Sequence, residues 1–301
     1  MFPRKLRRWW HGGNTLTVFC FHSVVAEPLP TPDPCFIPRT TFEKQLAGIA
    51  AEFDIQRLET ALDLLWKGSL RQPAAALTFD DGFRSHYEVV LPILRRMGFP
   101  ATLFLCTGTV APSEPLWFSR LHRAICLTQR ESVDWRGASL SLAPENRAST
   151  SSLLQGDVRK LDPDSVEGTV ESLCRQLEVD EPRRDDPSFG ALDPATITAM
   201  VREGTFRFGA HTRNHHVLSR LSPARQREEI VGSVTDVARL TGRSPALFAY
   251  PGGGPADFTS HADRILDELG LDAAFSMLEA PCTRQDTRFR LPRCVLGSRE
   301  L

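Results

Sequence analysis

The chain has 301 residues, of which 41% are apolar and 24% are charged. This composition is typical of a folded protein with one large α/β domain or two small ones. Its 36 basic and 37 acidic side chains nearly cancel, leaving a formal charge of −1. That balance excludes bulk electrostatic attraction to nucleic acid, whose phosphates require clustered lysine and arginine, so we expect no nucleic-acid partner.

The N-terminus is a basic tail, residues 1–14, that begins Met-Phe-Pro-Arg-Lys-Leu-Arg-Arg-Trp-Trp. Such a tail either contacts an anionic membrane surface or stays solvated and disordered, and the second interpretation is the simpler one. No segment approaches the ~20 apolar residues that span a bilayer, and no apolar run follows the tail as in a secretory signal. The seven cysteines are scattered, as is typical of reduced thiols. We therefore expect a cytoplasmic protein, with peripheral membrane association as the alternative.

Strand-like apolar runs alternate with helical patterns along the rest of the chain. The first strand is expected at 16–21, and Thr40-Thr41-Phe42-Glu43 has the form of a capping box at the start of a helix. Strands at 74–79 and 101–106 flank a further helix at 85–97. Later elements are a helix from Pro223 to Leu240, capped by Ser222 and ended by Gly242, and strands at 247–250 and 273–276.

This alternation predicts an α/β fold in which the strands pair in parallel, as in a (β/α) barrel formed by residues 15–301. An insertion interrupts the pattern at about 111–193. It begins with an apolar helix within 112–128 and then becomes richer in serine, proline and charge. We expect it to be helical in parts and to form a lid or a wall for the substrate; a flexible loop without a role is the alternative.

Two adjacent carboxylates end the strand expected at 74–79. In the run Ala-Leu-Thr-Phe-Asp-Asp-Gly, Asp80 and Asp81 follow an apolar, β-prone segment and precede Gly82. Neighbours on a strand point to opposite faces, so both can serve one site only where the backbone turns, which Gly82 permits. Alone, such a triplet is more often a solvated turn than a site.

Two histidines follow the strand-like segment 206–209. His211 and His215 are four residues apart, which puts both imidazoles on one face if the stretch is helical. One carboxylate and two neutral imidazoles suit a tetrahedral Zn²⁺ with its fourth position open to water. Such a metal acidifies bound water and polarises a carbonyl, and a spare carboxylate nearby can take the proton. The combination predicts metal-assisted hydrolysis.

These residues carry a resemblance to a known family. Thr78-Phe79-Asp80-Asp81-Gly82, His211-Thr212-x-x-His215 and Phe248-Ala249-Tyr250-Pro251-Gly252-Gly253 resemble the first three motifs of the polysaccharide deacetylases, the NodB-homology family. The resemblance covers most of the chain. It extends to the segments 91–104 and 289–293 and to Phe21-His22-Ser23-Val24, which is similar to the N-terminal histidine motif of exopolysaccharide-type members.

The resemblance implies the role of each residue. Asp80 would be the general base, and Asp81, His211 and His215 would bind the metal, for which Zn²⁺ is the first choice and Co²⁺ or Ni²⁺ are alternatives. Tyr250, Pro251 and Gly252 would contact the substrate, and a backbone N–H on or next to Gly252 would bind the oxyanion. The implied reaction removes the acetyl group from an N-acetylated sugar. The implied fold is a distorted, seven-stranded (β/α) barrel with the site at the C-terminal ends of its strands.

The motifs identify the acid that protonates the departing amine less directly than they identify the base and the metal ligands. No C-terminal Leu-x-His motif is present, and the last histidine, His261, falls in an amphipathic helical pattern typical of a surface or packing residue. His22 closes the strand at 16–21, where a lone histidine is otherwise often structural. The resemblance to exopolysaccharide-type members implies that His22 is the acid.

The third motif departs from the family pattern. Phe248 and Gly252 stand where many relatives carry an arginine and an aromatic residue, and the Asp-x-x-Asp-Trp motif is absent. Arg293, or Arg290, could supply the missing cation, because a nearby opposite charge keeps a carboxylate ionised. We place Arg293 in the site, among the substrate-binding residues; an arginine on a solvated strand edge is the alternative.

Three functions are compatible with these patterns. The first is a metal-dependent deacetylase of an N-acetylated polysaccharide, oligosaccharide or lipid-linked glycan. The second is a metal amidohydrolase that acts on a small amide without sugar. The third is a non-catalytic protein that only binds carbohydrate, against which the spare carboxylate of Asp80 argues, since a binding module would not need it. We expect the first.

Overall fold

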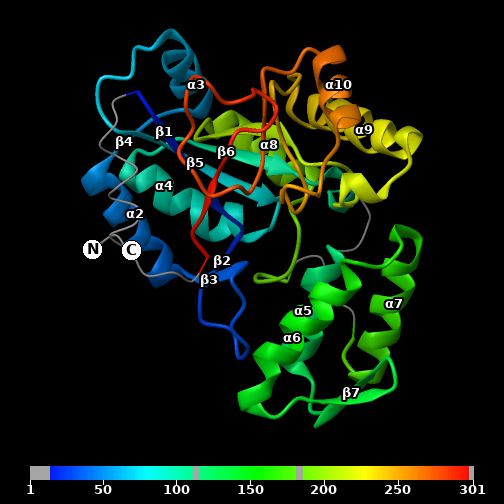
Figure 1. The fold of residues 1–301 in the computed structure, drawn as a ribbon. Helices are drawn as coiled ribbons and strands as arrows, with labels where there is room; N and C mark the ends of the chain where they lie inside the picture. Colours follow the sequence, from blue (N-terminus) through cyan, green and yellow to red (C-terminus); the bar gives the residue numbers. More distant parts are fainter. Residues whose placement is uncertain (1–13, 111–114, 181–185, 298–301) are drawn as a thin grey trace.

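A parallel sheet forms the centre of the protein, for which a computed structural model describes residues 14–110, 115–180 and 186–297. The strands of this central sheet pair in parallel and curl until Leu291, shortly before the strand at one edge of the sheet, bridges back to Phe275 on the strand at the opposite edge. The prediction of a distorted (β/α) barrel is thus confirmed (Figure 1). The order is β11 (Ala273–Phe275), β10 (Leu247–Ala249), β9 (Phe206–Ala210), β6 (Ala101–Leu105), β5 (Ala74–Asp81), β1 (Leu16–Phe21) and β12 (Cys294–Val295), with β4 (Asp54–Ile55) also paired to β5.

Helices cover the outside of this sheet. Their apolar faces pack on the outward side chains of the strands, such as Phe19 and Phe21. A small parallel pair, β2 (Ser23–Val25) and β3 (Phe36–Pro38), follows β1. The helices are α2 (Arg39–Glu52), α3 (Leu58–Lys67), the π-turn His86–Val90 that leads into α4 (Leu91–Met97), α8 (Pro194–Glu203), α9 (Pro223–Thr241) and α10 (Ser260–Glu268), with short 3₁₀ turns at Thr107–Thr109 and Leu218–Arg220.

The barrel interior changes from apolar to polar along the strands. Leu16 and Val18 of β1 are fully buried among inward side chains of the other strands. Because side chains alternate along a strand, Cys20 continues the inward row of β1. On β5 the same alternation carries Thr78 and Asp80 inward. The strands therefore deliver polar groups to one end of an otherwise apolar interior.

Two boundaries differ from the sequence-based expectation. The capping box at Thr40–Glu43 was wrong: α2 begins at Arg39, directly after Pro38, whose fixed φ of −63° starts the helix earlier. Glu43 pairs instead with Arg39 and Arg96, at 3.5 and 2.8 Å. The strand at 74–79 is longer than expected and runs through Asp81, so both carboxylates belong to β5.

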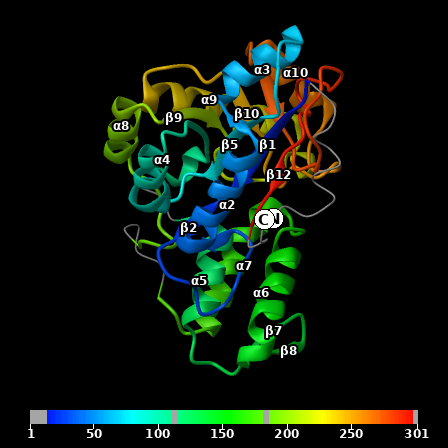
Figure 2. The same cartoon turned by 90° about the vertical axis from the view of Figure 1, so that its left-hand side faces the viewer.

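The insertion forms a lobe of its own beside the barrel (Figures 1 and 2). Its apolar side chains make a separate core that also includes Phe36 and Phe83 of the barrel. None of the described helices, in the lobe or elsewhere, is long and apolar enough to cross a membrane. The elements of the lobe are α5 (Trp117–Leu127), the hairpin β7 (Ser132–Trp135) and β8 (Ala138–Ser141), α6 (Pro144–Val158) and α7 (Pro163–Gln176).

Replacement of Gly209 by alanine should destabilise the barrel. Gly209 on β9 pairs with Phe104 on β6, and a Cβ at position 209 would collide with the buried Phe104 ring. We expect Gly209→Ala to lower the free energy of unfolding by about 1–3 kcal/mol, measured by urea denaturation. Gly168→Ala is the control, since Gly168 lies in α7 with open space around its Cβ position. That change should be neutral or stabilising by up to about 1 kcal/mol.

Candidate metal centre and active site

One backbone angle brings Asp80 and Asp81 to the same site. Asp80 points into the barrel, so regular strand geometry would turn Asp81 outward. Asp81 instead has φ of 79°, in the left-handed region, and Gly82 follows with φ of 89°. The reversal therefore begins at Asp81 itself, one residue before the glycine that the sequence indicated. Both carboxylates are buried, each 1% exposed.

The two histidines come from the loop after β9. The backbone N–H of His211 donates to Leu105 on β6, at 2.9 Å, and the ring Nδ1 donates to the carbonyl of Ala249 at 2.7 Å. The helical arrangement considered for this stretch is absent: Thr212 and His215 have φ of 61° and 56°. Thr212 stabilises the turn by accepting the N–H of His215 at 3.1 Å. The two imidazoles thus converge because Thr212 and His215 adopt left-handed backbone conformations, not because they share a helix face.

Asp81, His211 and His215 fit a divalent metal. Nε2 of His211 and Nε2 of His215 lie 3.6 and 3.4 Å from Oδ1 of Asp81. Ligands about 2.1 Å from a tetrahedral metal are about 3.4 Å apart. Both Asp81 oxygens are buried without a hydrogen-bond partner among the described residues, which a cation would correct.

The protonation of these groups agrees with metal binding. Burial lowers the pKa of both imidazoles, so they stay neutral, the form that ligates. The bond from Nδ1 of His211 to Ala249 leaves Nε2 with its lone pair free toward Asp81. Burial, and then the charge of Asp80, raises the pKa of the Asp81 carboxyl. A positive ion is what this carboxylate lacks.

Asp80 has a different partner. Arg293 donates to both Asp80 oxygens, at 2.8 and 2.7 Å, and it is fully buried beneath them. The guanidinium also contacts Thr78 and lies over the Phe104 ring, 5.4 Å from its centroid. Burial alone would raise the pKa of Asp80, but Arg293, together with His211 and His22, outweighs it and holds that pKa well below its usual range. Arg290 is placed elsewhere, at the surface with Asp263.

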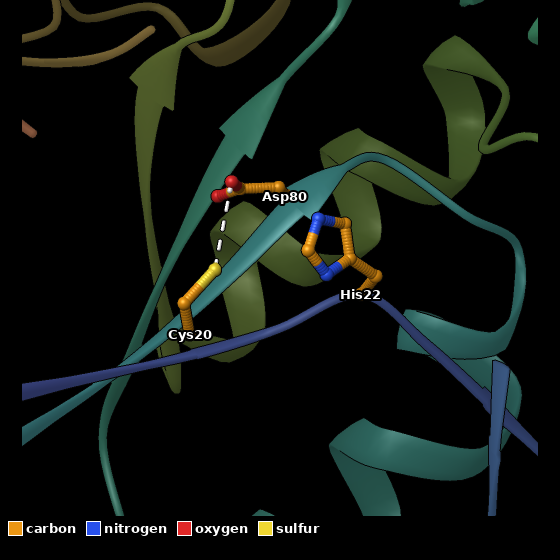
Figure 3. A group of neighbouring side chains, drawn as sticks. All are labelled: Cys20, His22 and Asp80. Carbon is orange, nitrogen blue, oxygen red and sulfur yellow. Dashed lines mark hydrogen bonds between the residues drawn. The ribbon is translucent and has the colours of Figure 1, made fainter. Parts of the chain in front are cut away.

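His22 lies beside Asp80, at the end of β1 (Figure 3). His86 donates from Nε2 to the His22 carbonyl at 2.9 Å, which fixes the backbone there. Burial lowers the pKa of the His22 imidazole. The Cys20 thiol lies below and donates to Asp80 Oδ2 at 3.6 Å. His261 is on α10, where its ring contacts the Pro223 carbonyl of α9.

A cavity of about 330 Å³ opens over these groups. Tyr250 and Gly252 line it, whereas Pro251 and Arg293 are not among its lining residues. Tyr250 is held by a hydrogen bond to Asp263 at 2.9 Å. Across the cavity, the insertion supplies a largely apolar wall, whose members are Trp117, Phe118, Gln155, Gly156, Arg159, Leu161, Pro163 and Val166.

Comparison with known proteins agrees with this geometry. The sequence model of the polysaccharide deacetylases matches residues 67–274, more than half of the chain. The chain belongs to the polysaccharide deacetylase family. It is accordingly a hydrolase of N-acetyl amide bonds. A search of curated proteins found no match.

Solved deacetylase structures share the fold at low identity. PplD of Streptococcus pyogenes, in complex with acetate, is 16% identical with a TM-score of 0.61, covering 94% of this chain and 93% of its own. IcaB of Ammonifex degensii is 20% identical with a TM-score of 0.61, covering 94% and 92%. The BpsB deacetylase domain of Bordetella bronchiseptica is 18% identical with a TM-score of 0.58, covering 94% and 96%.

Sequence reasoning missed several residues around the candidate site. Cys20 could have been found, because strand alternation from Leu16 and Val18 places it inward. Phe118, whose ring centroid lies 5.2 Å from that of His215, carried no local signal, since its contact depends on how the insertion packs. The same holds for Arg159, which belongs to a helix end far along the chain.

Removal of Arg293 should be costly. Arg293→Met would leave the Asp80 carboxylate buried without a partner, and we expect a loss of about 3–5 kcal/mol in unfolding free energy at pH 7. Because the folded pKa of Asp80 lies below its unfolded value, the stabilisation is present above pH ~4 and is lost as pH falls below it. The difference between wild type and variant should shrink over that range in urea titrations. The same change at Arg227, exposed and paired with Glu268, should cost at most about 1 kcal/mol.

Proposed function

We propose that this deacetylase is metal-dependent and acts on an N-acetylated sugar of a polysaccharide, an oligosaccharide or a lipid-linked glycan. The observation that supports metal dependence is the set of Asp81, His211 and His215 around two unpartnered carboxylate oxygens. Beside it stands Asp80, which is ionised and held by Arg293. The geometry suits hydrolysis, since a carboxylate free of metal duty can accept the proton of an attacking water.

Each residue then has a distinct task. Asp81, His211 and His215 would hold a divalent ion, Zn²⁺ first and Co²⁺ or Ni²⁺ as alternatives, which when bound supplies a Lewis acid and acidifies water. Asp80 accepts the proton of the attacking water, and Arg293 keeps the Asp80 carboxylate ionised and oriented. The backbone N–H on or next to Gly252 stabilises the oxyanion, an interaction typically worth about 2.7–4 kcal/mol. Tyr250 and Pro251 shape the loop that presents this N–H.

His22 is the proposed acid for the departing amine. It lies near Asp80 and is not one of the three proposed ligands Asp81, His211 and His215, although Cys20, His22 and Asp80 are also close enough together to hold an ion. Because burial lowers the pKa of its imidazole, the protonated ring gives up its proton more readily than a free histidine. His86 holds the backbone of His22 through its carbonyl. In this scheme Asp80 takes the proton of the attacking water, and His22 donates its own proton to the departing amine.

The proposed setting follows from the sequence. We propose a cytoplasmic protein whose basic N-terminus touches an anionic membrane surface if the glycan is lipid-linked, and we expect no nucleic-acid partner. Residues 1–13 lie outside the described residues. The glycan itself approaches through the cavity between barrel and insertion.

Acetate release tests the proposed function. Purified protein should release acetate from N-acetylglucosamine oligomers or from lipid-linked N-acetyl sugars. A chelator should abolish the release, and Zn²⁺, Co²⁺ or Ni²⁺ should restore it, because the three-residue site depends on the ion for activity. Release that is insensitive to chelation, in protein shown to have lost its metal, would contradict metal dependence.

Two variants separate metal binding from proton transfer in the same assay. His211→Ala should lose bound metal, measured by elemental analysis, together with activity. Asp80→Asn should retain metal and lose most turnover. Because Asp80 also pairs with Arg293, circular dichroism must first show that the Asp80→Asn protein is folded. Full activity of that variant would remove Asp80 from the role of base.

Loss of His22 should slow turnover without loss of metal. We expect His22→Ala to reduce kcat by about 10²–10⁴-fold, the usual contribution of a general acid, and to change the alkaline limb of the pH–rate profile. His261→Ala is the matched control and should behave as wild type, since His261 lies on the surface of α10. An alkaline limb identical to that of the wild type would argue against His22 as the acid.

A further inference from the structure

An arginine of the insertion reaches across the cavity to the barrel. Arg159 ends α6, and its Nη2 lies 2.5 Å from Oδ2 of Asp257, in the loop after β10. Asp257 is itself fixed by the N–H of Gly254, which donates to the same oxygen at 2.9 Å. The Arg159 side chain is 45% exposed and lines the cavity above the candidate metal centre. Its remaining N–H groups find no acceptor within the part of the chain that the structure describes, so they face the cavity and solvent.

The position of this guanidinium depends on Gly252. Gly252 has φ of 73°, a conformation that side chains disfavour. A Cβ there would also collide with the Arg159 guanidinium and with Asp257. The glycine in the third motif therefore makes room for Arg159 next to the N–H proposed to bind the oxyanion. Gly252 and Arg159 form a complementary pair, one from the barrel and one from the insertion.

Two arginines line the cavity, Arg159 and Arg220, and Arg159 is paired with Asp257. Asp80 is neutralised by Arg293, and Asp81 faces the two imidazoles of the candidate metal centre. Arg220 is a second exposed cation on the cavity wall, held by a hydrogen bond from Nη1 to the Lys160 carbonyl at 2.7 Å.

We infer that Arg159 is a specificity-determining residue that binds an anionic group of the glycan, next to the N-acetyl sugar. The inference rests on the proposed deacetylation. A guanidinium oriented by one carboxylate still offers paired N–H donors, whose planar geometry matches a carboxylate or a phosphate. The anionic group is either the carboxylate of an acidic sugar or a phosphate attached to the sugar, because both present the same pair of acceptor oxygens.

Three probes distinguish these sources in acetate-release kinetics. They are a neutral N-acetylglucosamine trisaccharide, N-acetylglucosamine 1-phosphate, and an oligosaccharide of alternating N-acetylglucosamine and glucuronic acid. The wild type should prefer one acidic probe over the neutral one. Arg159→Gln should lower that preference, as a ratio of kcat/KM values, by about tenfold, mainly through KM. Arg159→Lys should fall in between, because an ammonium keeps the charge without the paired donors.

The matched control is Arg225→Gln. Arg225 on α9 also joins the barrel to the insertion, through Asp164 at 2.9 Å, but it does not line the cavity. Its replacement should leave the preference unchanged. If Arg159→Gln lowers kcat/KM equally for neutral and acidic probes, or if Arg225→Gln has the same effect, Arg159 only anchors the insertion and the inference fails while deacetylation stands.

If no probe is hydrolysed, the proposed function is contradicted. The affinity of the protein for the acidic probes then tests the inference about Arg159. Calorimetry then compares the affinity of the wild type and Arg159→Gln for the two acidic probes. A loss of about tenfold for one of them in the variant supports the anionic subsite. Equal affinities in the two proteins overturn it.

Discussion

The buried ion pair between Arg293 and Asp80 determines how the active end of the barrel is organised. Arg293 precedes β12 and reaches past β1 to Asp80 on β5, so it joins segments that are far apart in sequence. Taking two charges out of water is costly, and the pair is tolerated because both Asp80 oxygens are bonded and the guanidinium also reaches Thr78 and the Ser276 carbonyl. The consequence is a carboxylate that is ionised and nearly immobile, in a place where an unpaired one would be protonated.

Two adjacent carboxylates therefore have opposite environments. Asp80 has a permanent cation and a pKa held low, while Asp81 has none and a pKa raised by burial and by Asp80. The left-handed turn at Asp81 creates this difference, because it points the second carboxylate toward His211 and His215 instead of outward. Neighbouring titratable groups with separated pKa values are typical of sites that divide acid, base and ligand roles. The division here is achieved by one dihedral angle and one arginine.

The sequence predicted the parts of this site that depend on local patterns. Strand periodicity located β1, β5 and β6, and the ligand types indicated a metal. Asp81 and His215 were found as residues but not as left-handed positions, because a positive φ is uncommon at any single non-glycine residue, even though Asp and His are enriched there. The capping box failed because Pro38 fixes where α2 begins. Arg293 was one of two candidates, and only the packing of the last segment against β1 and β11 distinguishes it from Arg290.

The insertion contributes to the site at two points, which argues against an independent appendage. Phe118 packs on the ring of His215, and Arg159 occupies the space above Gly252. A loop that merely covered the barrel would need neither contact. A glycine at position 252 then has a physical reason, because any side chain there would displace the guanidinium that the insertion brings in. Motif and insertion thus form one wall, in which a side chain at position 252 would require Arg159 to move.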